Sequence, residues 1–386
     1  MSGRDDPIVW IAGVGWDDTP GTDRRLVTAI AERHRVLWVD PPRRDAWGEW
    51  VGARAYPVAP VAPGVDRLRV PAPPGFTRWP ITLLTGVLHA QTIAGSRRRG
   101  ISPRAVVLSH PLTRFARRGS APRVLYLTDD WVAGAGLMGL DAAAVRRTLA
   151  DNARRSDVVA AVTAPLIDGV RALGAAGPAE VIPNGAPVLA PHRAVRHAVA
   201  GVVGQLNERL DLALLEAVVA AGVGLRLIGP RADRDPAFGR RLDALIAHER
   251  VEWTGALGAE ALRAQLAVIA VGLTPYADSP FNRASFPLKT LEYLAAGVPV
   301  VSSDLAASRW IDSAHVTVAD TPAAFVRAVR DAVGRTPVEE PSAEAARIAL
   351  AYAHRWEARA DDFLRLIDSA RRPSAAVGRQ PASGTR

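Results

Sequence analysis

The chain has 386 residues, 48% hydrophobic and 23% charged, which is long enough for two globular domains with buried cores. It contains no cysteine, which excludes disulfides and thiolate metal sites and fits a reducing cytosol. The net charge of +9 lies entirely in residues 1–128, which hold 19 arginines and 10 acidic residues. This excess reflects either an anionic partner (phosphate, nucleic acid or acidic lipid) or a genomic preference for arginine.

The first half of the chain alternates short apolar strands with helical segments. Strands are expected at residues 8–14, 35–40, 105–110, 123–129, 157–163 and 179–183, with helices such as 22–33 and 141–155 between them. Runs of β-branched residues separated by helices are typical of a parallel sheet whose two faces are covered. The pattern therefore predicts a parallel α/β domain.

Polar residues and glycines follow several of these strands. Gly13 and Gly15 form a G-x-G turn after the first strand, but Asp18 stands where a dinucleotide fingerprint has its third glycine. His110 ends a later strand, and Asp129 and Asp130 end the next one. Strand carboxyl ends line the ligand crevice of open α/β sheets, so these three are candidate catalytic groups. The alternatives are a structural histidine and a helix-capping aspartate.

Asn184 and Gly185 precede a proline-containing segment without periodicity, which we interpret as an interdomain linker. The alternation then begins again. Strands are expected at 199–205, 225–230, 251–255, 271–276 and 299–303, with helices at 211–222, 236–248, 259–270 and 287–296. Two α/β domains in series, 1–190 and 191–350, fit this pattern.

The segment SFPLKTLEYLAAGVPVVSSD, residues 285–304, contains the only lysine of the chain. Pro287 suits the start of a helix and Gly297 its end. Lys289 opposes the helix dipole unless an anion such as phosphate binds at the helix start. Glu292 lies on nearly the same face and could accept hydrogen bonds from ribose hydroxyls. The alternative is a packing helix with a surface Lys–Glu pair.

The same segment resembles the nucleotide-sugar motif of GT-B glycosyltransferases, in particular retaining family-4-like members of bacterial polysaccharide pathways. VIPNGAP (181–187), GVVGQLNERLDLALLE (201–216), LRLIGP (225–230), VEWTG (251–255) and VGLTPY (271–276) follow in that family's order. The similarity is good over residues 120–310 and weak before them.

The resemblance implies a donor site in the second domain. Glu292 matches the family glutamate that holds the donor ribose, whereas the other glutamate of the E-x7-E pattern is replaced by Ala284. Asn282 or Ser285 could substitute for it. The resemblance places further donor contacts at the following residues: Gly204, Asn207, Arg209, Gly229, Ser285, Leu288 and Lys289. It places Gly13, Gly15 and Asn184 on the acceptor side, and a histidine such as His110 near the donor sugar.

The predicted fold is therefore α/β, with two Rossmann-like domains whose parallel sheets face each other across a cleft (GT-B). A helix at 351–372 is expected to return to the first domain, and residues 373–386 to be a disordered tail. The predicted function is glycosyl transfer from a nucleotide sugar to a glycan, lipid-linked or small-molecule acceptor, with retention of configuration. The alternatives are a nucleotide-sugar epimerase, an NAD-dependent oxidoreductase and a non-catalytic sugar-binding relative.

No cofactor and no metal are expected. Asp233-Arg234-Asp235 spells the metal motif of the other glycosyltransferase fold, but it lies in a polar loop. Cations and a helix dipole can stabilise a departing diphosphate without a metal. The predicted partners are the nucleotide sugar, the acceptor and an anionic membrane surface, but not nucleic acid. The predicted location is the cytoplasm, peripheral to the inner membrane face.

Overall fold

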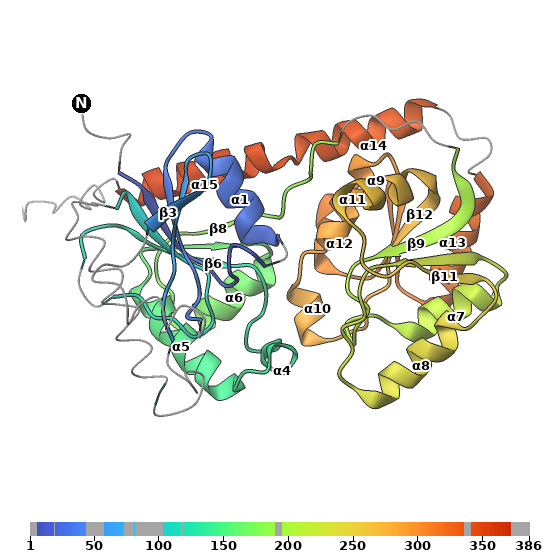
Figure 1. The fold of residues 1–386 in the computed structure, drawn as a ribbon, viewed down its shortest axis with the longest axis horizontal. Coiled ribbons are helices and arrows are strands. Elements are labelled where there is room, and N and C mark those ends of the chain that lie inside the picture. Colours follow the sequence, from blue (N-terminus) through green and yellow to red (C-terminus); the bar gives the residue numbers. More distant parts are fainter. Residues whose placement is uncertain are drawn as a thin grey trace, which may run out of the picture.

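The computed structural model describes residues 6–18, 20–43, 58–72, 81, 103–116, 119–189, 195–335 and 341–371. They form two α/β lobes, with a pair of C-terminal helices running along both (Figure 1). The predicted linker spans residues 186–198, and residues 190–194 of it lie outside the described residues, as does the predicted tail at 373–386.

The N-terminal lobe is built on a sheet with the strand order β3-β4-β2-β1-β5-β6-β7-β8. All neighbouring strands pair in parallel except β3 and β4. The strands are β1 (Ile8–Ile11), β2 (Val36–Val39), β3 (Val58–Ala62), β4 (Val65–Leu68), β5 (Ala105–Leu108), β6 (Arg123–Leu127), β7 (Val158–Ala161) and β8 (Ala179–Val181). The helices are α1 (Thr22–Ala31), α4 (Ala135–Met138), α5 (Ala142–Arg155) and α6 (Ala164–Ala172). β1, β2, β5 and β7 are buried along their whole length, as their apolar sequences predict.

The C-terminal lobe has the wholly parallel order β11-β10-β9-β12-β13-β14. Its strands are β9 (His197–Val203), β10 (Gly224–Ile228), β11 (Val251–Trp253), β12 (Ile269–Thr274), β13 (Val300–Ser303) and β14 (Val316–Ala319). Its helices are α7 (Leu212–Ala220), α8 (Pro236–Ile246), α9 (Ala259–Val268), α10 (Pro280–Ala284), α11 (Leu288–Ala295), α12 (Ala306–Ile311) and α13 (Pro322–Arg335).

Both sheets are doubly wound, so each has a point where the strand order reverses. In the N-terminal lobe this point lies between β1 and β5, and in the C-terminal lobe between β9 and β12. Ligands of open α/β sheets bind outside the carboxyl ends of the strands at this point. The loops after these four strands are therefore the first places to look for a site.

The chain ends with α14 (Pro341–Ala353) and α15 (Trp356–Arg371), which tie the lobes together (Figure 1). α14 packs on α11, and the Arg347 Nε donates to the Gly297 carbonyl at 2.6 Å. α15 packs on α1, and the Phe363 ring lies 5.2 Å from Trp10 and 5.3 Å from Tyr126 between ring centres. The predicted return of a C-terminal helix to the first domain is thus confirmed. Within the described residues, no helix has both the length and the apolar character that a membrane crossing needs.

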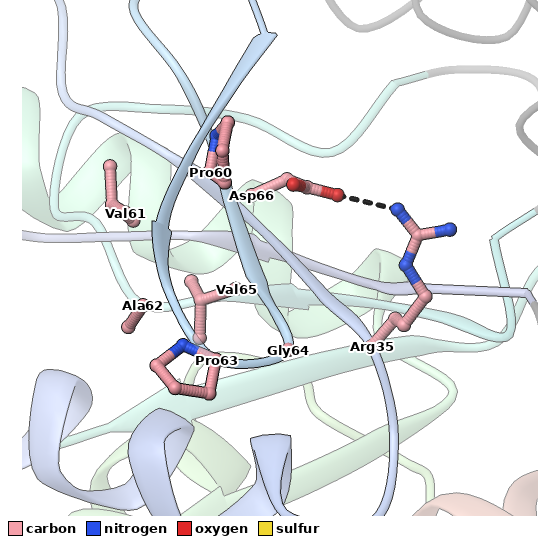
Figure 2. A pocket seen from close by; sticks show the side chains of 8 residues that line it. All are labelled: Arg35, Pro60, Val61, Ala62, Pro63, Gly64, Val65 and Asp66. Atoms are coloured by element: carbon pink, nitrogen blue, oxygen red, sulfur yellow. Dashed lines mark hydrogen bonds and ion pairs between the residues drawn. The ribbon is translucent and has the colours of Figure 1, made fainter.

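The β3–β4 hairpin at the edge of the N-terminal sheet was not predicted from the sequence. Figure 2 shows the pocket of about 460 Å³ beside it, where Arg35 reaches Asp66 over the turn at Pro63 and Gly64. This pocket contains none of the residues singled out from the sequence. The candidate site lies instead between the lobes.

Candidate functional site

The start of α11 carries the Lys–Glu pair expected from the sequence. Pro287 is the N-cap residue and provides no side-chain cap, and Leu288 begins the helix. The Lys289 Nζ lies 2.6 Å from the Glu292 Oε2, and the two side chains are 24% and 7% exposed. A carboxylate this deeply buried needs charged or polar partners, so the pair is not a solvated surface contact.

Two glycines bring the β9 and β10 loops close to this pair. Gly204 and Gly229 have φ values of +136° and +148°, which L side chains rarely adopt. A Cβ atom on Gly229 would lie 1.9 Å from the Gly204 carbonyl oxygen, and one on Gly204 would lie 3.8 Å from the Lys289 Cε. The backbone after β9 therefore passes directly beside Lys289, and the positive φ values at both positions favour glycine there.

Arg209 follows in the β9 loop and is held from several sides. Its Nε donates to the Asn282 Oδ1 at 3.0 Å, and its guanidinium lies over the Tyr276 and Phe281 rings at 5.1 and 4.8 Å. Its backbone N–H donates to the Asn207 Oδ1 at 3.2 Å. The cation is thus preorganised rather than mobile.

Asn282 and Ser285, the two candidates to replace the absent glutamate, have different surroundings. Asn282 is buried, and its Nδ2 donates to the carbonyls of Arg209 and Ala277. Because its amide is committed at both ends, it holds Arg209 and has no donor left for a sugar. The Ser285 Oγ instead lies 3.4 Å from Asp129 Oδ1 of the other lobe. Ala284 contributes its carbonyl, which accepts from the Thr163 Oγ1 at 2.6 Å.

The two acids after β6 differ in their environments. Burial raises the pKa of Asp129, while the nearby Arg209 guanidinium opposes the rise. Asp130 accepts from the N–H groups of Val132 and Ala133 at 3.1 and 2.9 Å, which is a turn-capping role. Asp129 therefore remains the candidate for contact with a substrate.

His110 lies at the end of β5 as a neutral imidazole. Its Nδ1 accepts from the N–H groups of Leu112 and Thr113 at 3.1 and 3.0 Å. Burial lowers its pKa to about 4. With Nδ1 used as an acceptor, the proton resides on Nε2, which makes His110 a neutral hydrogen-bond donor at neutral pH.

The first-strand loop and the linker residue Asn184 complete the N-terminal side. The Gly15 N–H donates to the Asp18 Oδ2 at 2.8 Å, so Asp18 closes the turn that a dinucleotide would need open. Asn184 is buried between the lobes, where it accepts from the Thr22 Oγ1 at 2.9 Å and donates to the Phe286 carbonyl at 3.0 Å. It joins the start of α1 to the loop before α11.

Two charged residues in this region were missed in the sequence. Asp23 is 6% exposed and accepts from the Ser109 Oγ at 2.9 Å and the Gly13 N–H at 3.4 Å. Burial is the main cause that raises its pKa to about 7. Arg25, also on α1, reaches Glu292 across the lobes with 2.9 Å between Nη2 and Oε1. The one feature of the sequence that could have pointed to them is their position in the polar first turn of a helix that follows a glycine-containing loop.

The D-x-D sequence is used for structure. Asp233 pairs with Arg231 at 3.0 Å, and Asp235 caps α8 by accepting from the Ala237 N–H at 2.8 Å. In the described parts of the chain, no group of three or more metal-ligating side chains occurs. The cations of the site are arginine and lysine side chains.

The site therefore joins two kinds of chemistry. The C-terminal lobe presents cations and glycine turns at an uncapped helix start, which suits a diphosphate. The N-terminal lobe presents a buried carboxyl and a neutral imidazole donor, which suit hydroxyl groups. Such an arrangement can hold a charged leaving group on one side and a sugar or an alcohol on the other.

Comparison with solved structures gives the class of fold. Sucrose-phosphate synthase from Thermosynechococcus elongatus superposes with a TM-score of 0.70 at 18% identity, over 94% of this chain and 98% of that one. HepE of Anabaena, in complex with UDP and glucose, gives 0.63 at 14% identity over 94% and 99%. An E. coli trehalose-6-phosphate protein bound with UDP-2-fluoro glucose gives 0.65 at 13% over 95% and 99%. The predicted GT-B fold is confirmed.

Sequence comparison finds similarity to glycosyltransferases within this fold class. Residues 197–334 match the family model described as Glycosyl transferases group 1. The "Putative teichuronic acid biosynthesis glycosyltransferase TuaH" of Bacillus subtilis (strain 168) is 30% identical over 143 residues, which are 36% of this chain and 35% of that protein. The chain thus matches about a third of that relative. Together these findings support a GT-B glycosyltransferase.

Proposed function

We propose that the protein transfers a sugar from a nucleoside diphosphate sugar to a glycan or related hydroxyl acceptor. The observation that carries this proposal is the Lys289–Glu292 pair at the uncapped start of α11, beside the glycine turn at Gly204. It lies within the segment that matches the glycosyltransferase group 1 model. The diphosphate binds at Lys289 and the helix start, and Glu292 accepts from the ribose hydroxyls.

The reaction breaks the bond between the anomeric carbon and the diphosphate and joins that carbon to the acceptor oxygen, while the proton of the acceptor hydroxyl passes to the departing diphosphate. Lys289, Arg209 and the helix dipole stabilise the negative charge that develops on the leaving group, so no covalent nucleophile is required. Asp129 and the Nε2–H of His110 orient sugar hydroxyls. The solved GT-B neighbours bind UDP, glucose and UDP-2-fluoro glucose, which supports this class of donor for this chain. A trehalose-6-phosphate synthase of the same fold transfers its sugar with retention, which supports a retained anomeric configuration here.

The acceptor is proposed to be an envelope polysaccharide or its lipid-linked precursor. The similarity to a glycosyltransferase of teichuronic acid biosynthesis supports a polysaccharide acceptor. The arginine excess of residues 1–128 supports docking of the protein at an anionic membrane surface. Flotation with liposomes tests this docking, and binding that does not depend on anionic lipid would contradict it.

Neither of the two alternative enzymes has an observation in its favour. An NAD-dependent oxidoreductase needs an open glycine turn after β1, which Asp18 closes at Gly15. A nucleotide-sugar epimerase would give an isomerised sugar rather than a transferred one. One product assay with a donor sugar separates transfer from isomerisation.

A thermal-shift screen against UDP-, GDP- and dTDP-sugars tests the donor proposal. One of these donors should stabilise the wild-type protein, and Lys289→Ala should lose most of that stabilisation because a charge-assisted phosphate contact is removed. Arg283→Ala is the matched control, since it removes an exposed cation of nearby α10 that pairs with Asp278. An unchanged shift in Lys289→Ala would rule out its phosphate role.

A further inference from the structure

Glu292 is held by two cations that come from different lobes. Its Oε2 lies 2.6 Å from the Lys289 Nζ on the same helix, and its Oε1 lies 2.9 Å from the Arg25 Nη2 on α1. The Glu292 side chain is 7% exposed and that of Arg25 is 29% exposed. The carboxylate proposed to bind ribose is thus already engaged by a residue of the N-terminal lobe.

The contact between Arg25 and Glu292 is electrostatic rather than a well-aligned hydrogen bond. Within the described residues, no donor is directed at the buried Oε1 with hydrogen-bond geometry. A carboxylate oxygen offers about two acceptor sites, so this one can still accept from a ligand hydroxyl. A ribose hydroxyl that donates to Oε1 would gain a full hydrogen bond and would compete with Arg25.

Two cations meet one carboxylate at this contact, while Asp23 in the first turn of α1 accepts instead from Ser109 and Gly13. Arg25 and Lys289 share a single carboxylate, and neither α1 nor α11 has a side-chain cap at its start. The bridge through Asn184 joins Thr22 at the start of α1 to Phe286 before α11, so both helix starts lie at this junction. Two cations and two positive dipole ends at one junction favour an anion with more than one charge.

We propose that Arg25 is a further diphosphate-binding cation, which Glu292 holds in place until the donor arrives. Ribose hydroxyls take the Glu292 carboxylate, and the Arg25 guanidinium moves to the diphosphate beside Lys289. This inference rests on the proposed function and deepens it, because it adds a donor-binding residue from the N-terminal lobe. Donor binding then links the lobes through the ligand, which favours a closed arrangement during transfer.

Titration calorimetry on Arg25→Gln tests the exchange. The diphosphate probes are UDP, GDP and dTDP, which match the donors of the thermal-shift screen. The nucleoside of whichever diphosphate the wild type binds is the second ligand, and its binding is followed by ligand-observed NMR. Arg25→Gln should weaken the diphosphate about tenfold, the usual loss for one charge-assisted hydrogen bond. It should leave the nucleoside as tightly bound as before or more tightly, because the ribose no longer competes with Arg25.

Arg24→Gln is the matched control, since it removes the same charge from the adjacent position of α1. The Arg24 guanidinium donates to the Trp16 carbonyl at 2.8 Å and lies over the Trp16 ring, away from Glu292. It should change diphosphate affinity less than twofold, which is about 0.4 kcal/mol.

Weaker binding of the diphosphate together with unchanged or tighter binding of the nucleoside supports the proposal, because a merely structural role for Arg25 would weaken both. Unchanged diphosphate affinity in Arg25→Gln, or an equal loss for diphosphate and nucleoside, would overturn the inference alone. A wild-type protein that binds none of the three diphosphates would overturn the proposed function and this inference with it.

Discussion

Asp129 is the carboxyl that brings the N-terminal lobe into contact with the donor lobe. It lies 3.4 Å from the Ser285 Oγ, and burial raises its pKa. Because a sugar hydroxyl needs a charged acceptor there, Asp129→Asn should lower kcat by about 100-fold or more. Steady-state transfer measured with the identified donor checks this value.

Asp141→Asn is the matched control for that substitution. It makes the same chemical change at the N-cap of α5, where the side chain accepts from the Ala144 N–H. Asparagine is an equally good cap, so stability and kcat should stay close to wild type. Equal activity losses in both variants would remove the case for Asp129.

The ionisation of Asp23 should make the free energy of unfolding depend on pH. Its pKa is raised from 3.8 to about 7 by burial. Below about pH 3 the acid is mostly protonated in both the folded and the unfolded state, so its contribution to stability is complete. Between pH 4 and pH 7 only the unfolded state ionises, and this contribution is lost.

Asp23→Asn does not titrate and should remove this loss. The free energy of unfolding of the wild type should fall by up to about 4 kcal/mol relative to Asp23→Asn between pH 4 and pH 7. Urea denaturation of both proteins at intervals of one pH unit measures the difference. Parallel pH profiles would show that Asp23 is ionised in the folded protein throughout this range.

At the scale of elements, the end of α11 shows how a glycine fixes a helix in place. Gly297 has a φ of +72°, and a Cβ atom there would lie 2.5 Å from the Glu344 Cγ on α14. Gly297→Ala should therefore destabilise the protein by about 1–2 kcal/mol. Urea denaturation at pH 7 gives the value.

Gly334 provides a control with the opposite sign. It lies in α13, and a Cβ atom added there would point into open space, with no contact within 4 Å outside the helix backbone. Gly334→Ala should stabilise the helix by about 0.5–1 kcal/mol, since alanine loses less entropy there. If both substitutions had the same sign, the left-handed conformation at Gly297 would not be the cause.

Local patterns allowed much of α11 and its neighbours to be predicted. Pro287, Gly297 and the spacing of Lys289 and Glu292 are short-range signals, and the structure has the helix they indicate. The β3–β4 hairpin was not predicted. It contains prolines at positions 60 and 63, and proline is rare in strands away from a sheet edge. The alternation of apolar strands and helices was sufficient for the two doubly wound sheets.

The contacts between lobes could not be predicted from local patterns. The burial of Asp23 depends on Ser109, and the position of Arg25 depends on Glu292 in the other lobe. Nothing in the residues around either side chain marks such a partner. The pairing of Asn282 with Arg209 also appears only once the loops after β9 and β12 are folded together.

At the scale of the whole molecule, α15 holds the C-terminal end on the N-terminal lobe. Phe363 is fully buried between Trp10 and Tyr126. Phe363→Ala should cost about 3–5 kcal/mol in unfolding free energy of the N-terminal lobe, because it leaves a cavity. Phe363→Leu, which keeps most of the volume, should cost about half as much or less.

Differential scanning calorimetry of the wild type, Phe363→Ala and Phe363→Leu measures this loss of stability. The unfolding transition of the N-terminal lobe should occur at a lower temperature in the variants. The chain also passes from one lobe to the other beside the turn between α14 and α15, where the Ala186 N–H donates to the His354 carbonyl at 2.8 Å. Loosening α15 should therefore weaken donor binding as well. Donor affinity in Phe363→Ala equal to that of the wild type would show that α15 has no part in positioning the lobes.

The central claim is that a nucleoside diphosphate binds with its phosphates at the start of α11. A crystal structure of the full chain with the diphosphate selected by thermal shift tests it most directly. The account predicts phosphate oxygens within about 3 Å of the Lys289 Nζ and the Leu288–Lys289 backbone, and ribose hydroxyls on Glu292. Nucleotide bound in the loop after β1, with Lys289 still paired only to Glu292, would contradict it.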